Sequence, residues 1–592
     1  MTPKPLRLLL VGIFAAVALV LAACGGSDSS DSGAGASSKG SAASTTPTEG
    51  KQGGTLTQLG TSDVDYNDPG HSYYQLGFQV IFAWGRPLYG YKPGTSTRVP
   101  DLAQAEPQIT DGNKTLTIKI RPNVKFAPPV NRVITSKDVK YAIERSFSSN
   151  VGGQYAQAYF SSIEGAPSAD NTPKAPKAIS GLQTPDDQTL VIKLKDASAG
   201  LVSGALEMAI TVPVPKEYAS KFDAKTPSTY NDHVVASGPY MIQNDASGEL
   251  TGYQAGRQIT LVRNPNWDKS TDFKPAYLDK IVMKTNGSDA AVEGQQVLRG
   301  QSETLDSNPP ATVLQQAVQQ YKGQYSQVAS GGFRWFPLNT KIKPLDNVNV
   351  RKAILAGFDR NAARLARGGQ FVGPIGTHFI PPGVPGFDQA GGNKGEGQDF
   401  MANPSGNDQL AAEYMKKAGY PSGKYTGNDE LLMITANVDP GKAQAQVAQA
   451  QLQKLGFKVR LRTVPQDAVY TEWCQVPAKK VAICGSAGWF KDFADPQSML
   501  DPTFKGSNIR AQGNNNLPQL DDPAIDAAMT KASTLTGNER FQAWADIDKM
   551  ITDQAPAIPF VWDNTTVIGS KNVQLAQNPS STLADFAWTS LK

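Results

Sequence analysis

The first 24 residues decide where this chain folds, and therefore which forces can hold it together. Lys4 and Arg7 form a basic start, and residues 8–21 form an apolar run of signal-peptide length. The run ends in Leu-Ala-Ala-Cys at Cys24, a lipobox pattern that predicts a lipoprotein signal peptide at 1–23 and lipidation of Cys24. Two acyl chains suffice for stable anchoring. We therefore expect an extracytoplasmic protein, lipid-anchored at the outer face of the cytoplasmic membrane.

The alternative is an uncleaved anchor helix with an incidental cysteine, but the run is short for a hydrocarbon core of ~30 Å. Residues 24–50 consist almost wholly of Gly, Ser, Ala, Thr and Asp. Such a composition predicts a disordered tether, which would span roughly 28 Å root-mean-square as a flexible coil.

Two further cysteines, Cys474 and Cys484, would lie in an oxidising compartment, so a disulfide between them is expected. Closing so short a loop should stabilise the fold by roughly 3 kcal/mol. A metal pair is the alternative, but the three histidines, His71, His233 and His378, are far apart in the sequence. We expect neither a metal nor a cofactor.

Charge and motifs exclude several classes of function. The chain has 57 Lys and Arg against 53 Asp and Glu, a balance that supports neither nucleic-acid binding nor a polybasic membrane surface. No phosphate-binding Gly-Lys-Ser/Thr loop occurs. Residues 484–488 approach a nucleophile elbow but lack the glycine two positions before the serine. We therefore expect no enzymatic activity, and the single apolar run excludes a transporter pore.

Hydrophobic periodicity indicates an α/β protein. The 592 residues are too many for one core, so two or three domains are expected. Residues 116–120 alternate as a half-buried strand, and Thr135 to Asp138 resemble a helix capping box. Residues 431–435, 443–455 and 459–463 read as strand, helix and strand, which predicts a βαβ unit.

Five segments carry a family resemblance through their order and spacing. They are 99–103 with 116–126 and 135–145, 237–240 with 259–267, 338–340 with 350–360, 380–386, and 488–496. Together they resemble the family 5 extracytoplasmic solute-binding proteins, the peptide and nickel receptors of ABC importers, from about residue 53 to 562. The chain departs from the family pattern at 127–132, where a His-Asp-Gly turn is usual, and in a Gly/Asn-rich insertion at 388–407.

The resemblance implies a periplasmic-binding-protein-like type II fold, with two lobes around a ligand cleft and an extra domain inserted in the first lobe. Lobe I would comprise residues 51–95, 218–330 and 558–592. The inserted domain would comprise 96–217, and lobe II 331–557.

The resemblance also implies a function. The protein would capture oligopeptides for the permease and ATPase subunits of an ABC importer. Trp489 and Asp492 match the family's Trp-x-x-Asp, in which the aspartate pairs with the peptide amino terminus and the tryptophan walls the cleft. Such a charge-assisted bond is the stronger kind. The alternative is that Asp492 only caps a turn before Asp495.

Other candidate ligand-binding residues follow from position. Ser237, Gly238 and Tyr240 match the segment whose backbone runs beside the ligand, although a structural turn is the alternative. Arg334 and Trp335 can reach the cleft, where Arg334 would hold a carboxylate, or Arg334 is a solvated surface residue. Tyr73 and Tyr74 are weaker candidates that would otherwise serve packing.

Two other functions stay open. The same fold can bind an oligosaccharide, a nickel chelate or haem, although few histidines weigh against direct nickel binding. A lipoprotein of this kind can also signal without feeding an importer. A gene neighbourhood that encodes permeases and ATPases would separate these functions.

Overall fold

The computed structural model describes residues 49–95, 97–153, 155–306, 309–485 and 487–592. The expected signal peptide, Cys24 and all but the last two residues of the expected tether lie outside these ranges. Within the described ranges, no helix is both long and apolar enough to cross a bilayer.

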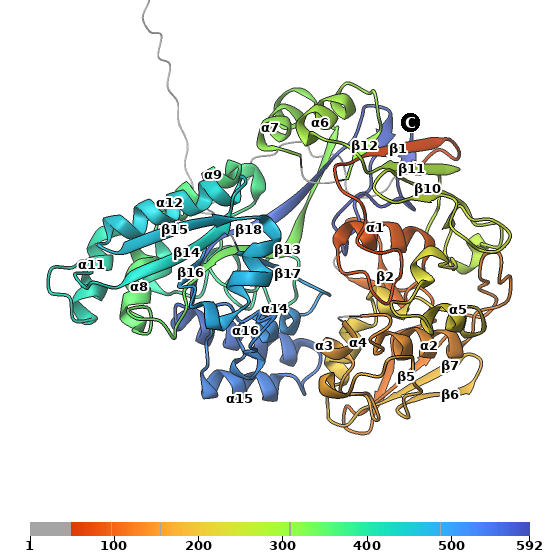
Figure 1. The fold of residues 1–592 in the computed structure, drawn as a ribbon, viewed down its shortest axis with the longest axis horizontal. Coiled ribbons are helices and arrows are strands. Elements are labelled where there is room, and N and C mark those ends of the chain that lie inside the picture. The colour runs from red at the N-terminus through yellow and green to blue at the C-terminus, as the bar shows by residue number, and fades with distance from the viewer. Residues whose placement is uncertain (1–48, 96, 154, 307–308, 486) are drawn as a thin grey trace, which may run out of the picture. The chain divides into compact units, whose positions relative to one another are not determined.

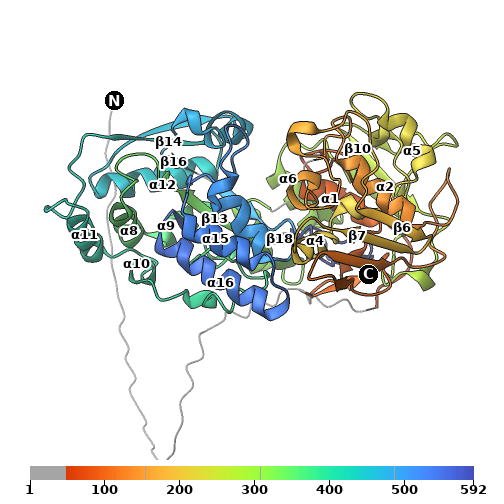
Figure 2. The same cartoon turned by 90° about the horizontal axis from the view of Figure 1, so that it is seen from below.

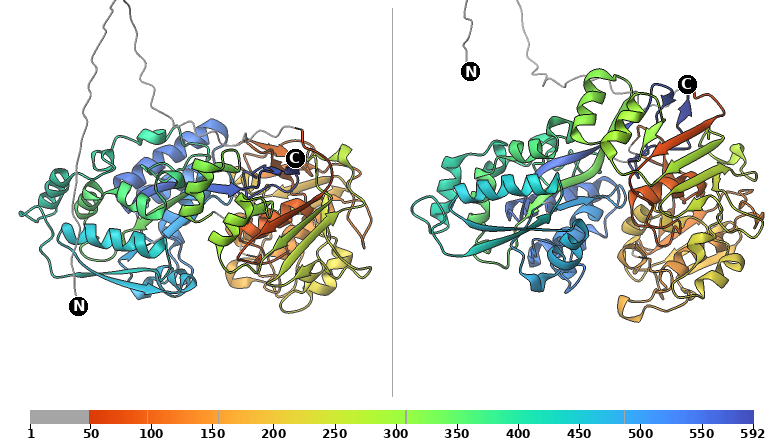
Figure 3. Two further views of the ribbon diagram at one scale, coloured as in Figure 1. Left: turned by 90° about the horizontal axis from the view of Figure 1, so that it is seen from above. Right: turned by 45° about the horizontal axis from the view of Figure 1, so that its top comes forward.

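The first sheet has six strands and begins the fold. Its order is β12-β1-β11-β10-β8, with β9 on β10; β1 runs parallel to β11 and β12, and β10 is antiparallel to its neighbours. We call the part built on this sheet lobe I. Figure 3 shows the C-terminus beside β1, where Leu591 bridges Lys51. The elements are β1 (Thr55–Leu59), α1 (Gln75–Trp84), α5 (Lys216–Asp223), β8 (Tyr240–Ile242), β9 (Tyr253–Gln254), β10 (Gln258–Arg263), β11 (Lys280–Lys284), α6 (Ala290–Leu298), β12 (Thr304–Leu305), α7 (Ala311–Gln320), β19 (Val573–Gln574) and β20 (Ser590–Leu591).

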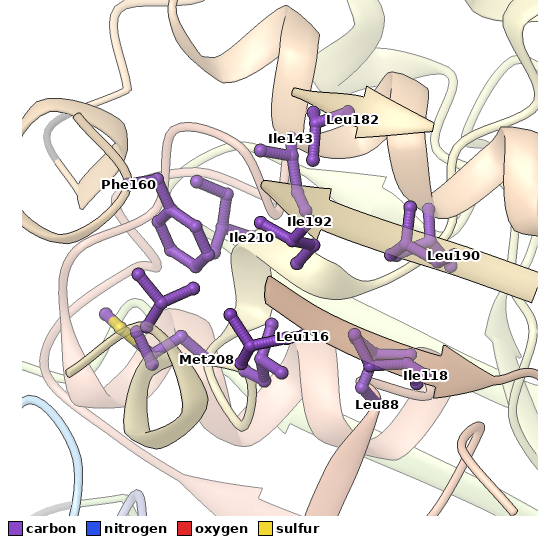
Figure 4. Close-up of a cluster of buried hydrophobic side chains, with 14 of the residues drawn as sticks. Leu88, Leu116, Ile118, Ile143, Phe160, Leu182, Leu190, Ile192, Met208 and Ile210 are labelled. Carbon is purple, nitrogen blue, oxygen red and sulfur yellow. The ribbon is translucent and has the colours of Figure 1, made fainter. Parts of the chain in front are cut away.

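A four-stranded antiparallel sheet, in the order β4-β5-β7-β6, forms the inserted domain. Helix α2 lies along β6 and β7 (Figure 2), and the predicted capping box is present at its start, where the Asp138 carboxylate accepts from the Thr135 N–H. Apolar side chains from the sheet and α2 form one buried cluster, including Ile118, Ile143 and Ile192 (Figure 4). The hairpin of β2 (Tyr89–Tyr91) and β3 (Arg98–Pro100) joins lobe I to this domain. The other elements are β4 (Gln108–Thr110), β5 (Thr115–Lys119), α2 (Ser136–Ser146), α3 (Tyr155–Tyr159), β6 (Leu182–Asp186), β7 (Thr189–Lys193) and α4 (Ala199–Ala205).

Lobe II contains the predicted βαβ unit. Strand β14 pairs in parallel with β15, and α12 connects the two, so this prediction is confirmed. A disulfide joins Cys474 to Cys484, with Cα atoms 6.1 Å apart. The elements are α8 (Val348–Gly357), α9 (Arg360–Arg367), α10 (Asp399–Ala402), α11 (Asp408–Lys417), β14 (Glu430–Ala436), α12 (Gly441–Lys454), β15 (Lys458–Val464), α13 (Gln466–Ala468), β16 (Ile483–Cys484), β17 (Ala487–Phe490), α14 (Pro496–Phe504), α15 (Pro523–Ala532) and α16 (Gly537–Asp553).

Two long antiparallel strands, β13 (Tyr325–Pro337) and β18 (Ala557–Ile568), connect the lobes (Figure 1). Tyr325 and Ile568 pack in a cluster with Leu59 of lobe I, whereas Phe336 and Ile558 pack in the lobe II core. The ladder shifts register near residues 329–332 and 334–335. The chain therefore passes between the lobes along β13 and again along β18.

Buried ion pairs fix the inserted domain to lobe I. The Arg145 guanidinium on α2 is fully buried and donates to Asp68 and to Asp223, with shortest distances of 2.6 Å to each carboxylate. Asp68 precedes α1 and Asp223 ends α5. A buried guanidinium needs such partners, because an unpaired buried charge is strongly destabilising.

Candidate ligand-binding site

The segment that follows β17 places one carboxylate at a meeting point of all three parts of the molecule. Strand β17 is held against β13, with Trp489 opposite Phe333. Asp495 begins α14, accepting from the Gln497 N–H at 2.8 Å and pairing with Arg540. The capping role therefore belongs to Asp495, and the structure leaves Asp492 for other contacts.

Asp492 faces tyrosines of the inserted domain. The hydroxyl of Tyr159 donates to one carboxylate oxygen, and that of Tyr155 lies 3.5 Å from the other. Both tyrosines lie on α3 four positions apart, so their side chains share one side of that helix. Tyr73 of lobe I stacks on Tyr155 with ring centroids 5.0 Å apart. We call this group of Asp492, Tyr73, Tyr155 and Tyr159 the Asp492 junction.

The charge of Asp492 is not neutralised in this arrangement. Burial raises the pKa of its carboxyl to about 6, although the two tyrosine hydroxyls favour the ionised form. Among the residues that the structure describes, no lysine or arginine forms an ion pair with it. Asp492 is half-buried, and a carboxylate of this kind without a cation is suited to pairing with a positively charged ligand group.

A second carboxylate, on one of the two strands that connect the lobes, is surrounded by cations. Asp563 on β18 accepts from Arg334 of β13 at 2.6 Å and from Arg367 of α9 at 2.6 Å. Burial by itself would raise the pKa of Asp563, but the two guanidiniums outweigh it and hold that pKa below its usual range. The Arg334 guanidinium also stacks 4.7 Å from the centre of the Phe490 ring. Two cations on one carboxylate leave an excess positive charge.

Four of the expected ligand contacts, Trp335, Ser237, Gly238 and Tyr240, serve packing in this arrangement of the chain. Trp335 is only 1% exposed and packs against Phe333, Phe379 and Phe504 in the lobe II core. Side chains alternate along a strand, so Arg334 and Trp335 point to opposite sides of β13. Only Arg334 remains available to a ligand.

The segment 237–240 is also structural. The Ser237 hydroxyl accepts from the Arg86 N–H at 2.9 Å, and the fully buried Tyr240 hydroxyl accepts from the Leu278 N–H at 3.1 Å. A Cβ on Gly238 would lie 3.0 Å from the Trp84 carbonyl oxygen, so glycine serves close packing against α1. The backbone N–H groups of Ser237 and Gly238 also donate to the Trp84 carbonyl of lobe I.

The remaining candidates are Trp489, Tyr73 and Tyr74, and only Tyr73 lies at the Asp492 junction. Trp489 is half-buried, donates its ring N–H to the Ser498 carbonyl at 2.9 Å and packs against the lobe II core. Tyr73 belongs to the Asp492 junction, whereas Tyr74 is exposed. Sequence reasoning missed Tyr155 and Tyr159, and the spacing of two tyrosines by four positions was the available signal. It also missed Arg367 and Asp563, which are far apart in the sequence and carry no motif.

Comparison with known proteins identifies the family. The model of the middle region of the bacterial extracellular solute-binding proteins, family 5, matches residues 97–511, so the chain belongs to that family. The chain is 26% identical over 559 residues to heme-binding protein A of Haemophilus influenzae, covering 92% of each chain. It is 25% identical over 484 residues to the oligopeptide-binding protein OppA of Bacillus subtilis, covering 79% of this chain and 80% of that one.

A solved structure has the same fold. The clavulanic acid biosynthesis oligopeptide binding protein 2 superposes with a TM-score of 0.80 at 22% identity, covering 92% of this chain and 96% of that one. The fold is thus the α/β, periplasmic-binding-protein-like type II fold that the sequence predicted.

Proposed function

We propose that this protein captures short oligopeptides for an ABC importer by pairing the peptide α-ammonium with Asp492. The observation that carries the proposal is the uncompensated carboxyl of Asp492, held by the hydroxyls of Tyr155 and Tyr159. A peptide ammonium supplies the missing cation, and its three N–H groups suit a carboxylate flanked by phenol oxygens. The relatives named for oligopeptides support the same ligand class.

Arg334 and Arg367 would receive the other end of the peptide. The Arg334 guanidinium lies over the Phe490 ring, 4.7 Å from the ring centre, and Phe490 is two positions before Asp492. The carboxylate and the guanidinium therefore lie within the reach of one short peptide. The excess positive charge at Asp563 would then pair with the terminal carboxylate, for which a planar guanidinium is well suited.

The proposal includes delivery and anchoring. The permease and ATPase subunits of an importer would take the ligand from the protein, which a diacylglyceryl group on Cys24 would tether to the membrane. The lipobox supports this anchor. We also propose the domain division expected from the sequence, with 51–95, 218–330 and 558–592 as lobe I, 96–217 as the inserted domain and 331–557 as lobe II. The first residues of the segment 558–592 still pack in the lobe II core, where β18 leaves that lobe. Cys24→Ala should give unprocessed or released protein, and membrane-bound protein of processed mass would contradict the anchor.

Substitution of Asp492 by asparagine tests the ligand role, because it keeps the shape and removes the charge. A peptide ammonium left beside a neutral amide costs roughly 3–5 kcal/mol. Calorimetry should therefore show an affinity for tri-alanine that is lower by about two to three orders of magnitude. N-acetylated tri-alanine should bind the wild type equally poorly. Asp408→Asn is the matched control, since Asp408 pairs with Lys454 on the surface. Unchanged affinity of Asp492→Asn would refute the proposal.

A second candidate ligand is haem. A relative that matches this chain over 559 residues is named for haem binding. The exposed Tyr66 ring stacks on His71 with centroids 3.5 Å apart, in the loop that carries Tyr73. Haemin titration followed by absorbance tests this candidate. Tight binding of haemin together with no binding of tripeptides would replace the peptide proposal.

A further inference from the structure

Phe493 of lobe II extends into the core of the inserted domain. Its ring is 1% exposed and belongs to the buried cluster of the inserted domain, together with Tyr159 and Val202. The Tyr159 ring lies edge-on to it, with ring centroids 4.9 Å apart. Among the described residues, the two buried clusters of lobe II do not include Phe493. A side chain of lobe II therefore completes the core of a different domain.

The backbone of Phe493 is nevertheless held by lobe II. Its carbonyl accepts from the Asp495 N–H at 2.8 Å and from the Ser498 hydroxyl at 3.0 Å. Asp495 in turn pairs with Arg540 of α16 at 2.8 Å. Because the ring is fixed to lobe II in this way, lobe II and the inserted domain can separate only if the ring leaves its place in the inserted domain.

Gly204 on α4 makes room for the Phe493 ring. A Cβ at position 204 would lie 2.7 Å from a carbon atom of that ring, which is closer than packed carbon atoms approach. The backbone at 204 is helical, and alanine is a better helix former than glycine. The glycine therefore serves the contact with lobe II and not the helix that carries it.

Two hydrogen bonds cross between the same two domains. The Ala494 N–H donates to Glu207 at 3.3 Å, and the Asn113 amide donates to the Thr534 carbonyl at 3.0 Å. Water can replace these partners when the domains separate, so the hydrogen bonds contribute less than the ring. Exposure of an apolar ring has no such compensation, and it shifts a two-state equilibrium by about 10- to 100-fold.

We propose that Phe493 is a positioning residue that docks lobe II on the inserted domain, so that the empty protein rests in a closed arrangement and the Asp492 junction forms only there. Asp492 directly precedes Phe493, so undocking of the ring withdraws the carboxylate from Tyr155 and Tyr159. Admission and release of a solute then require the ring to leave the inserted domain. This applies to any solute that binds between the lobes, and it does not rest on the peptide function.

Small-angle X-ray scattering of the empty protein tests the docking, because separation of the lobes increases the radius of gyration. Phe493→Ala should shift the ratio of closed to open protein by about 10- to 100-fold toward the open form, with a larger radius of gyration than the wild type. Gly204→Ala should have an effect in the same direction from the other side of the contact. The double variant should expand no more than Phe493→Ala alone, since the alanine at 204 then meets no ring.

Leu365→Ala is the matched control, because it truncates a lobe II side chain that is 73% exposed, and it should keep the wild-type radius of gyration. Thermal unfolding shows whether each variant is folded. If Phe493→Ala does not fold, Gly204→Ala decides the test, because that substitution removes no buried side chain.

Tri-alanine separates this proposal from the peptide function. It should leave the radius of gyration of the wild type unchanged and make the two single variants compact again. Calorimetry should show an affinity of these variants that is lower by up to about tenfold, since only the closed fraction binds. If the empty variants are expanded and no protein binds tri-alanine, the docking proposal stands and the peptide proposal fails. Equal radii of gyration for the empty wild type and the folded variants would overturn the docking proposal.

Discussion

Two carboxylates, Asp492 and Asp563, differ in what surrounds them, although Asp563 and Phe490, two positions before Asp492, both pair with Gly332 of β13. Asp563 is 3% exposed and holds two guanidiniums, whereas Asp492 contacts only tyrosine hydroxyls. Burial acts on both in the same direction, and the cations alone reverse its effect at Asp563. Asp563 is therefore a satisfied ion-pair partner, and Asp492 is a site that still lacks one.

The two carboxylates should make the stability of the folded protein depend on pH in opposite directions. For Asp563, the folded pKa is below the unfolded value, so its contribution to stability is present at neutral pH and is lost as pH falls through the folded pKa. For Asp492, the folded pKa of about 6 is above the usual aspartate value of 3.8. The folded protein binds more protons between these values, so stability decreases as pH rises through this window. A structural carboxylate and a binding carboxylate can thus be told apart by titration.

The largest effect is expected from Asp563→Asn. The substitution leaves Arg334 and Arg367 without a carboxylate, and breaking a buried pair from one side costs about 3 kcal/mol or more. Urea-induced unfolding at pH 7.5 should show this loss of stability, while Asp408→Asn should change stability by less than about 0.5 kcal/mol. A loss of stability under about 1 kcal/mol for Asp563→Asn would mean that water replaces the carboxylate. Asp563 would then not be a structural ion-pair partner, and its contrast with Asp492 would be wrong.

The same substitution at Asp492 should stabilise the empty protein. Asp492→Asn removes a carboxyl whose raised pKa corresponds to a cost of up to about 3 kcal/mol at pH 7.5. Urea unfolding at pH 7.5 should show the variant to be more stable than the wild type, and at pH 4 the two should coincide. A variant that is less stable at both values would mean that Asp492 has a cation partner.

Much of the fold was predictable because its signals are local. Alternation at 431–435 and 459–463 with a helical stripe between them predicted the βαβ unit, and Thr135 with Asp138 predicted the start of α2. Each signal depends on residues that lie within one or two turns of one another. The arrangement of the lobes was predicted from the family motifs, because hydrophobic periodicity does not show how domains are arranged.

The site was less predictable because it depends on long-range contacts. Asp492 was named from its motif, but Tyr155 and Tyr159 reach it from more than 300 positions away. For Trp335, the sequence does not say which side of β13 faces the core, and a shift of one position exchanges the two sides. The packing of Ser237 and Tyr240 depends on long-range contacts as well, with the N–H groups of Arg86 and Leu278, which the motif does not show.

Affinity for a peptide should depend on pH through Asp492. The ammonium pairs with the ionised carboxylate, so below pH 6 binding must displace a proton from Asp492. Calorimetry with tri-alanine should give the highest affinity near pH 7, a decrease toward pH 8 as the peptide amino group loses its proton, and a fall of about tenfold for each pH unit below about 6. The Asp492→Asn variant should lose the fall on the acid side. A profile that is flat from pH 5 to 7 in the wild type would show that another group holds the ammonium.

The smallest effect is expected from the tyrosine that supports Asp492. Tyr159→Phe removes the shorter of the two hydroxyl contacts and leaves the ring, which packs edge-on against Phe493. Loss of one hydrogen bond of about 1 kcal/mol should weaken binding of tri-alanine at pH 7.5 by about fivefold. Because that bond favours the ionised carboxylate, the pH below which affinity falls should also move upward. Tyr155→Phe is the matched control, since its 3.5 Å contact is too long to contribute much, and it should change both quantities less. An equal effect of the two substitutions would show that the tyrosines act by packing and not by stabilising the charge.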